Sequence, residues 1–297
     1  MGMTIGLSVF VTLFVLDIVM GEFRKPGALS MNELGVNLIS IVIAFSIRAL
    51  PFAGITYLLV TFLPEWRNAL AHTHFAVLFL AVLLLDDYGN YWFHRQAHQI
   101  PWLWRLHKPH HIPTRMNVLM GVRESTFYYL LIPVNVMAPL LVFVGAEEAG
   151  AAMLGLKLTV GYLQHVGYRW DLWLRRFAPG RLFLDLAENL FSLQDFHHVH
   201  HGIGRYGNAS SNYGNVLNIW DKIHNTSSGH PHCAQDAYGV PTGAKVESWA
   251  VQLFWPLCRE RKVKPDASSI IVQSSPDELE AAQAIIFTAE GLAIAVR

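Results

Sequence analysis

The chain has 297 residues, of which 53% are hydrophobic and 15% are charged, and its mean hydropathy is +0.31. An ordinary soluble domain carries more charge, so this composition indicates a membrane protein. The formal net charge is zero and the sequence has no long basic run, which argues against a nucleic-acid partner. Cys233 and Cys258 are too few for a disulfide framework and lack metal-site spacing.

Five apolar segments are predicted to enter or cross a bilayer, which takes about 20 helical residues. They are residues 5–20, 34–63, 69–85, 126–144 and 149–166. The first lacks the basic start of a signal peptide, so we expect an anchor that stays. The second contains Arg48 and Pro51 and would be roughly 45 Å long as one straight helix, which is long for one crossing and short for two. The last two, joined by a short GAEE turn, predict a helical hairpin.

Basic residues near the ends of these segments predict the orientation, because they collect on the cytoplasmic side of a membrane. They are Arg24, Lys25, Arg95, Arg105, Lys108, Arg115, Arg123 and the RERKVK run at 259–264. All of them lie on one side if residues 34–63 cross once. The sequence then predicts an all-α membrane bundle whose histidine-rich end faces the cytoplasm, in a bacterial inner membrane or the endoplasmic reticulum.

The chain is predicted to have four parts. They are N-terminal membrane spans over 1–68, a histidine-rich domain over 69–225, an interfacial segment over 226–264 and a soluble tail over 265–297. Residues 246–257, with Trp249 and Trp255, form either a helix lying on the bilayer or an amphipathic helix packed on its own domain, and the sequence leaves both open. In the tail, Ser275 and Glu278 predict a capping box at the start of a helix.

Nine of the 15 histidines lie within residues 94–111 and 197–201. At about 100° per helical residue, His94 and His98 share one face of a helix. Two further sets each fall within an arc of about 100°. They are His107, His110 and His111, and His197, His200 and His201. His198 falls outside the arc of its neighbours, and Pro109 leaves open whether the helix of its set begins only there.

Convergent histidines at this density predict a metal centre. Imidazole suits zinc, copper, iron and nickel, and one ion rarely takes more than six donors, so eight or nine such residues predict two ions. We interpret five histidines outside these two windows as ordinary core or surface residues. These are His72, His74, His224, His230 and His232. The GIGRYG stretch at 202–207 fits a dinucleotide motif but follows a histidine set and not a strand, so we interpret it as a turn.

The spacing resembles that of the fatty acid hydroxylase and sterol desaturase superfamily of membrane di-iron enzymes. Its pattern of HxxxH, HxxHH and a later HxxHH is matched by the three sets above, and YWFHR, LWRLH and NYGNVLNIWD match its neighbouring motifs. The resemblance covers about residues 70–225. The chain departs from the family pattern at Gln194, Asp195 and His198 and in HNT at 224–226, which leaves the substrate open.

The resemblance implies two iron ions that activate O2 to hydroxylate or desaturate an apolar lipid, such as a fatty acyl chain or a sterol. The implied ligands are His94, His98, His107, His110, His111, His165, His197, His200 and His201. Acceptors for the imidazole N–H groups are then expected, and the candidates are Asp87, Asp195, Asn212 and Asp221. With no haem-binding domain, nucleotide site or four-cysteine cluster in the sequence, a separate protein is expected to donate electrons.

Two other classes of function stay open. A membrane zinc hydrolase is the first, although the sequence has no H-E-x-x-H and a catalytic zinc needs only three protein ligands. The second is a non-catalytic membrane scaffold in which metal only fastens the fold.

Overall fold

The chain is described by a computed structural model that covers residues 2–25, 30–240, 246–259, 285–288 and 291–294. The helices are α1 (Gly2–Val19), η1 (Glu22–Arg24), α2 (Met31–Ser46), α3 (Ala49–Phe62), η2 (Pro64–Trp66), α4 (Phe75–Gln99), α5 (Pro101–His111), η3 (Val118–Val122), α6 (Thr126–Leu131), α7 (Val134–Val144), α8 (Glu147–His165), α9 (Trp170–Leu174), α10 (Ala178–Ala187), α11 (Gln194–His201), α12 (Ile219–Ile223) and α13 (Trp249–Phe254). The strands are β1 (Gly202–Ile203), β2 (Ala237–Tyr238), β3 (Ile285–Thr288) and β4 (Gly291–Ile294).

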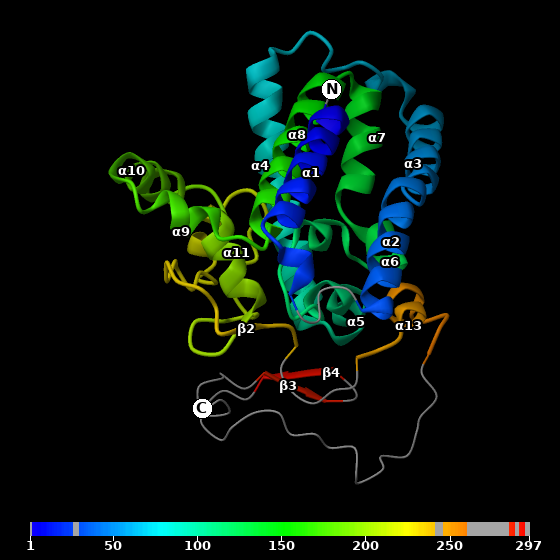
Figure 1. Cartoon of the computed structure of the whole chain (residues 1–297). Helices are drawn as coiled ribbons and strands as arrows, with labels where there is room; N and C mark the ends of the chain where they lie inside the picture. Colours follow the sequence, from blue (N-terminus) through cyan, green and yellow to red (C-terminus); the bar gives the residue numbers. More distant parts are fainter. Residues whose placement is uncertain (1, 26–29, 241–245, 260–284, 289–290, 295–297) are drawn as a thin grey trace.

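The long helices form a bundle. Short elements, including α5, α13 and β2, gather at the end that lies at the bottom of Figure 1, which we call the cap end, and α9 and α10 project from the side of the bundle. Among the described residues, four segments are long and apolar enough to cross a membrane. They are Gly2–Val19, Met31–Phe62, Phe75–Gln99 and Thr126–Val144. The chain is therefore an integral membrane protein with an all-α bundle, as its composition predicts.

The first helix is part of the bundle and is not a detached anchor. α1 packs along α8, so closely that a Cβ on Gly2 would lie 1.8 Å from the carbonyl oxygen of Ala151. Near the cap end, the buried carboxylate of Asp17 accepts hydrogen bonds from the backbone N–H of Val118 at 2.7 Å and of Gly167 at 3.2 Å. α1 is thereby joined to η3 and to the turn that follows α8.

The segment predicted over 34–63 crosses the bundle once, as two helices joined by a bend. Ser30 starts α2 by accepting a hydrogen bond from the N–H of Glu33 at 3.1 Å. After the bend at residues 47–48, α3 continues to the end of the bundle opposite the cap (Figure 1). α3 has no buried residue, and its apolar side chains face outward, where a bilayer would cover them.

The helix that carries the second histidine set begins well before the proline inside it, so the set does not start a helix of its own at Pro109. α4 leads into α5, which starts at Pro101 and continues through Pro109 to His111. Pro109 lies in the last turn of α5, where its missing N–H costs the helix a single backbone hydrogen bond. Its carbonyl oxygen accepts a hydrogen bond from Nε of Arg123 at 2.7 Å.

The hairpin predicted from residues 126–166 is formed, with a break in its first arm. α6 ends before Pro133, α7 ends at Gly145 in the left-handed region with φ +79°, and α8 returns alongside α7. The carboxyl end of α8 reaches the cap end (Figure 1).

The cap end is completed by short elements. β1 pairs antiparallel with β2, so that Gly202 lies opposite Tyr238, and the rest of the GIGRYG stretch forms a turn. α13 packs on α2, α5 and α6, which agrees with the second alternative for residues 246–257. β3 and β4 form an antiparallel hairpin, whereas the capping box predicted at Ser275 lies outside the described residues.

Candidate metal centre

Four helices bring the nine predicted ligands together at the cap end. α4 carries His94 and His98 near its carboxyl end, α8 ends at His165, and α5 and α11 carry the two sets of three. Because α4 and α8 run toward the cap from the membrane, the centre lies where the spanning helices meet the short helices of the cap (Figure 1).

The nine imidazoles form two neighbouring groups that could each hold a metal ion. In each group, one ring nitrogen per residue lies within 4.8 Å of all the others. The groups are His94, His98, His107, His111 and His200, and His110, His165, His197 and His201. The rings of His111 and His201, one from each group, stack with centroids 4.3 Å apart. Each group therefore combines histidines from three helices.

The protein fixes the tautomer of five of these rings. Their Nδ1 atoms lie within hydrogen-bond distance of an oxygen: 2.9 Å for His94 to Tyr213 O, 2.9 Å for His107 to Glu124 Oε1, 3.3 Å for His110 to Arg123 O, 2.6 Å for His165 to Gly161 O and 2.7 Å for His200 to Ser211 O. A carbonyl oxygen only accepts, so the Nδ1 atoms of His94, His110, His165 and His200 carry the proton, and that of His107 carries it when Glu124 is ionised. The lone pair is then on Nε2, which points into the group.

The Nε2 atoms are brought together without other partners. Those of His94, His98 and His200 are buried and have no hydrogen-bond partner among the described residues. In the second group, Nε2 of His197 lies 2.9 Å from that of His165. The Nε2 lone pairs of His94 and His200 are buried without a hydrogen-bond partner, which is costly unless a cation takes them, so the donor arrangement fits metal binding.

Burial keeps these imidazoles neutral, which metal binding requires. It lowers the pKa of each ligand candidate on α5 and α11 well below 6.5, and the neighbouring imidazoles lower most of these pKa values further. These residues are His107, His110, His111, His197, His200 and His201.

Glu124 is the one acidic side chain that pairs with any of the nine rings in the part of the chain that the structure describes, and the sequence reasoning missed it. Besides its 2.9 Å contact with His107, its Oε1 lies 3.8 Å from Nδ1 of His110. Burial raises the pKa of Glu124, and the adjacent Arg123 partly offsets this. The only signal in the sequence is an isolated carboxylate in the apolar stretch between two histidine-bearing helices.

The four candidate acceptors are placed elsewhere, and none is hydrogen-bonded to an imidazole of the two groups in the described structure. Asp87 accepts hydrogen bonds from the N–H groups of Val216 and Leu217 at 2.8 and 2.9 Å. Asp221 similarly binds the N–H groups of Tyr213 and Gly214 at 2.8 and 2.7 Å. Carboxylates are drawn to buried backbone donors that have no other acceptor, so they hold the segment that supplies Tyr213 O to His94.

The other two candidates stabilise the third histidine helix. Asn212 donates to the carbonyl oxygen of Phe196 in α11 at 2.9 Å, and Asp195 pairs with Arg169. His198 is also directed away from both groups, because its Nδ1 lies 2.8 Å from the hydroxyl oxygen of Tyr238.

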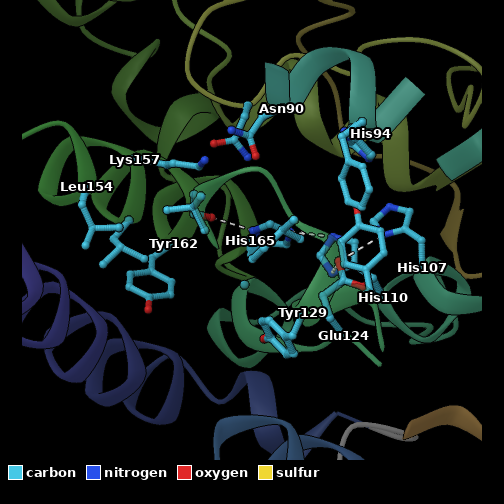
Figure 2. A pocket seen from close by; sticks show the side chains of 18 of the residues that line it. Asn90, His94, His107, His110, Glu124, Tyr129, Leu154, Lys157, Tyr162 and His165 are labelled. Atoms are coloured by element: carbon cyan, nitrogen blue, oxygen red, sulfur yellow. Dashed lines mark hydrogen bonds and ion pairs between the residues drawn. The ribbon is translucent and has the colours of Figure 1, made fainter. Parts of the chain in front are cut away.

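A cavity of about 180 Å³ adjoins the centre between α4, α6 and α8. Figure 2 shows His94, His107, His110 and His165 on one side of it, and Leu154 and Tyr162 farther along α8. A second, mostly apolar cavity of about 210 Å³ lies between α1, α2 and α8 and shares wall residues with the first, including Arg48, Leu154 and Tyr162.

Comparisons with known proteins agree with this geometry. Residues 79–226, which include all nine histidines of the two groups, match the family described as fatty acid hydroxylase. Alkylglycerol monooxygenase of Danio rerio is 27% identical over 269 residues, which cover 85% of this chain and 53% of that protein. Ornithine lipid hydroxylase OlsE of Rhizobium tropici is 30% identical over 206 residues, which cover 66% and 54%.

A third relative, methylsterol monooxygenase 1-2 of Arabidopsis thaliana, is 25% identical over 153 residues, which cover 50% of this chain and 45% of that protein. The chain thus spans about half the length of these curated relatives. No solved structure matches it. The match of the whole histidine-bearing region and the shared family of these relatives show that the chain belongs to the fatty acid hydroxylase and sterol desaturase superfamily.

Proposed function

We propose that this protein is a membrane oxidoreductase that uses O2 to hydroxylate or desaturate an apolar lipid at a pair of iron ions. The observation that carries the proposal is the arrangement of nine imidazoles, eight of them in buried residues, in two adjoining groups beside a cavity. The names of the relatives, which describe hydroxylation or monooxygenation, support the reaction class.

The residues present fit two metal ions. The first group offers five nitrogen donors and the second offers four, which suits iron and leaves open positions on both ions. Two irons held there would supply the activation of O2 that an unactivated C–H bond requires. The imidazoles add no negative charge, and Glu124 is the one acidic side chain among the described residues that contacts any of them, through His107 and His110.

The substrate would approach from within the bilayer. The second cavity is lined by apolar side chains of the spanning helices, including Leu7, Phe10 and Ile41, and it adjoins the cavity at the centre. A lipid chain could therefore reach the centre without passing through water, and the apolar walls would keep bulk water away from the reacting carbon. Arg48 lies on the wall of both cavities and could bind a polar head group.

We further propose that the cap end faces the cytoplasm and that a separate protein delivers electrons to it. Basic residues support the orientation, since Arg105, Lys108 and Arg115 all lie in or beside α5 at the cap end. The same end carries the short helices that a soluble donor could reach.

Metal analysis and a turnover assay test the proposal together. The chain is purified under anaerobic conditions, its metals are counted, and lipids are compared between cells with and without the gene. We expect about two iron atoms per chain and an oxidised lipid that appears only with the gene and O2. An active sample with one zinc and no iron would instead support the hydrolase, and metal without any O2-dependent product would support the scaffold.

A further inference from the structure

Three other potential metal ligands lie together outside the nine-histidine centre. They are Glu188, at the end of α10, and His230 and His232 in the loop before β2. One ligand atom from each lies within 4.8 Å of the other two. We infer that this cluster is a further metal site, which takes a zinc ion. The sequence interpretation of both histidines as ordinary residues does not account for their convergence on a buried carboxylate.

The buried atoms of the cluster lack partners. Oε1 of Glu188 and both ring nitrogens of His230 are buried and make no hydrogen bond within the described part of the chain. A neutral imidazole has one N–H to donate and one lone pair to share, and leaving both unused in a buried place is costly. Nδ1 of His230 lies 3.8 Å from Oε2 of Glu188, and a metal ion between the ring and the carboxylate would use the lone pair and a carboxylate oxygen at once.

His232 is the third candidate ligand. Nε2 of His232 lies 3.0 Å from Oε2 of Glu188, and its side chain is 39% exposed, so this side of the site is open to water. Two histidines and one carboxylate are a donor set that zinc takes in proteins, with a water at the fourth position. His230 is ready to bind at neutral pH, because burial lowers its pKa to about 4.

The ion pairs around the cluster leave one carboxylate oxygen unused. Arg175 pairs with Oε2 of Glu188 and, at 2.7 Å, with Asp185, and so it leaves Oε1 for a metal. The hydrogen-bonded carboxylates and guanidiniums around the cluster are Asp171, Asp185, Glu188 and Asp195, and Arg169 and Arg175. Arg181 and Lys222 add positive charge that acts on Asp185 and on His230, so the donor set, and not the local net charge, favours zinc.

The site would connect α10 to the helix of the third histidine set. The backbone N–H of His232 donates to Asp195 at 2.9 Å, and the ring of His230 packs on Phe196 with centroids 5.2 Å apart. His232 has φ +51°, a conformation that is strained for a residue with a side chain. A metal that holds His232 in this conformation would also hold the loop against α11, so its role is to fasten the cap end.

Zinc counting tests the inference. The full chain in detergent is stripped with a chelator, saturated with zinc and desalted, and bound zinc is measured by mass spectrometry. We expect the double variant His230→Ala, His232→Ala to bind one zinc fewer per chain than the wild type. His72→Ala is the matched control, because His72 is exposed and belongs to neither this cluster nor the two groups. It should bind as much zinc as the wild type.

This comparison does not depend on the metal or the reaction at the nine-histidine centre, because that centre is the same in every variant. Equal zinc in the wild type and the double variant would overturn the inference. Glu188→Gln guards against a folding defect, since a glutamine can still accept a hydrogen bond from Arg175 while the charge is lost. We expect it to weaken the zinc affinity of one site by at least about tenfold, and an unchanged affinity would also overturn the inference.

Discussion

His198 is a buried histidine between predicted ligands that has a different partner. Its Nδ1 lies 2.8 Å from Tyr238 Oη, outside both groups. We therefore expect His198→Ala to keep bound metal and most activity, whereas His197→Ala, His200→Ala or His201→Ala loses both. Losing a direct ligand should exceed the ~10 to 100-fold effect that is typical of changes one residue farther from a metal.

The four variants are compared for iron content and product formation at matched expression. His198→Ala serves as the control: if it folds normally, a buried imidazole on α11 can be removed without loss of the fold. If His198→Ala were as inactive as the others, the division of α11 into ligand and non-ligand histidines would have to be abandoned.

Glu124 sets the proton of His107, so its loss should weaken metal binding without removing a ligand. We expect Glu124→Ala to lower metal affinity ~10 to 100-fold. Glu124→Gln should lose less, because its amide oxygen can still accept the Nδ1–H. Metal competition with a chromogenic chelator measures the affinity. Glu148→Ala, an exposed glutamate at the start of α8, is the control, and unchanged affinity in Glu124→Ala would contradict the assigned contact.

Asp87 links one element to another, since it joins α4 to the segment that leads into α12. It accepts hydrogen bonds from Val216 N, Leu217 N and Trp220 Nε1. We expect Asp87→Ala to lower the free energy of unfolding by ~1–3 kcal/mol for each buried donor left unpaired, and Asp87→Asn to lower it less. Thermal unfolding in detergent measures this, with the exposed Glu65→Ala as control. Equal stability of Asp87→Ala and the control would refute the link.

Periodicity explains which parts of these elements could be predicted from the sequence. Apolar segments and histidines spaced by three or four residues are local patterns, and they predicted the four candidate spans, the hairpin and the gathering of the histidines. They were wrong for residues 69–74, which precede α4, for residues 149–166, which are not among the candidate spans, and for the convergence of each set of three on one point. Which sets share a group depends on how helices pack. His200, for instance, joins His94, while its neighbour His201 joins His110. No local pattern encodes that division.

The dependence on tertiary packing also explains why the hydrogen-bond acceptors of the imidazoles could not be predicted from the sequence. A carboxylate such as Asp221 is visibly unusual in sequence, but whether it binds an imidazole or a backbone N–H depends on segments that meet only in the fold. Glu124 had no periodic signal at all. Its partner His107 lies 17 residues away, across a loop whose course is set by tertiary packing.

For the whole molecule, the buried histidines predict acid sensitivity. Burial lowers their pKa values in the folded chain, so below pH 6.5 the unfolded chain binds more protons. Stability of the metal-free protein should therefore fall as pH falls from 6.5, and bound metal should be retained at pH 6.5. Thermal unfolding and metal retention between pH 7.5 and 5, roughly the range in which free histidine titrates, measure both. A metal-free protein whose stability rises on acidification in this range would contradict the neutral state of the centre.

The proposed orientation of the bundle is testable by chemical labelling. After Cys233 and Cys258 are replaced by serine, single cysteines are introduced by Arg115→Cys and Arg205→Cys at the cap end and by His72→Cys at the opposite end. We expect a membrane-impermeant thiol reagent to reach the first two only from the cytoplasm and the third only from the other side. Labelling of positions 115 and 205 from different sides would rule out a shared centre.

Through the hydrogen bonds of Asp17, α1 stabilises the cap end in addition to inserting into the membrane. An unrelated hydrophobic anchor in place of α1 would restore membrane targeting, yet it would leave the N–H groups of Val118 and Gly167 without their acceptor. It would also remove Leu7 and Phe10 from the wall of the apolar cavity. Exchanging this helix among related proteins would therefore change the wall through which the proposed lipid substrate reaches the centre, and a purification tag that displaces Gly2 from its close contact with α8 is better placed elsewhere.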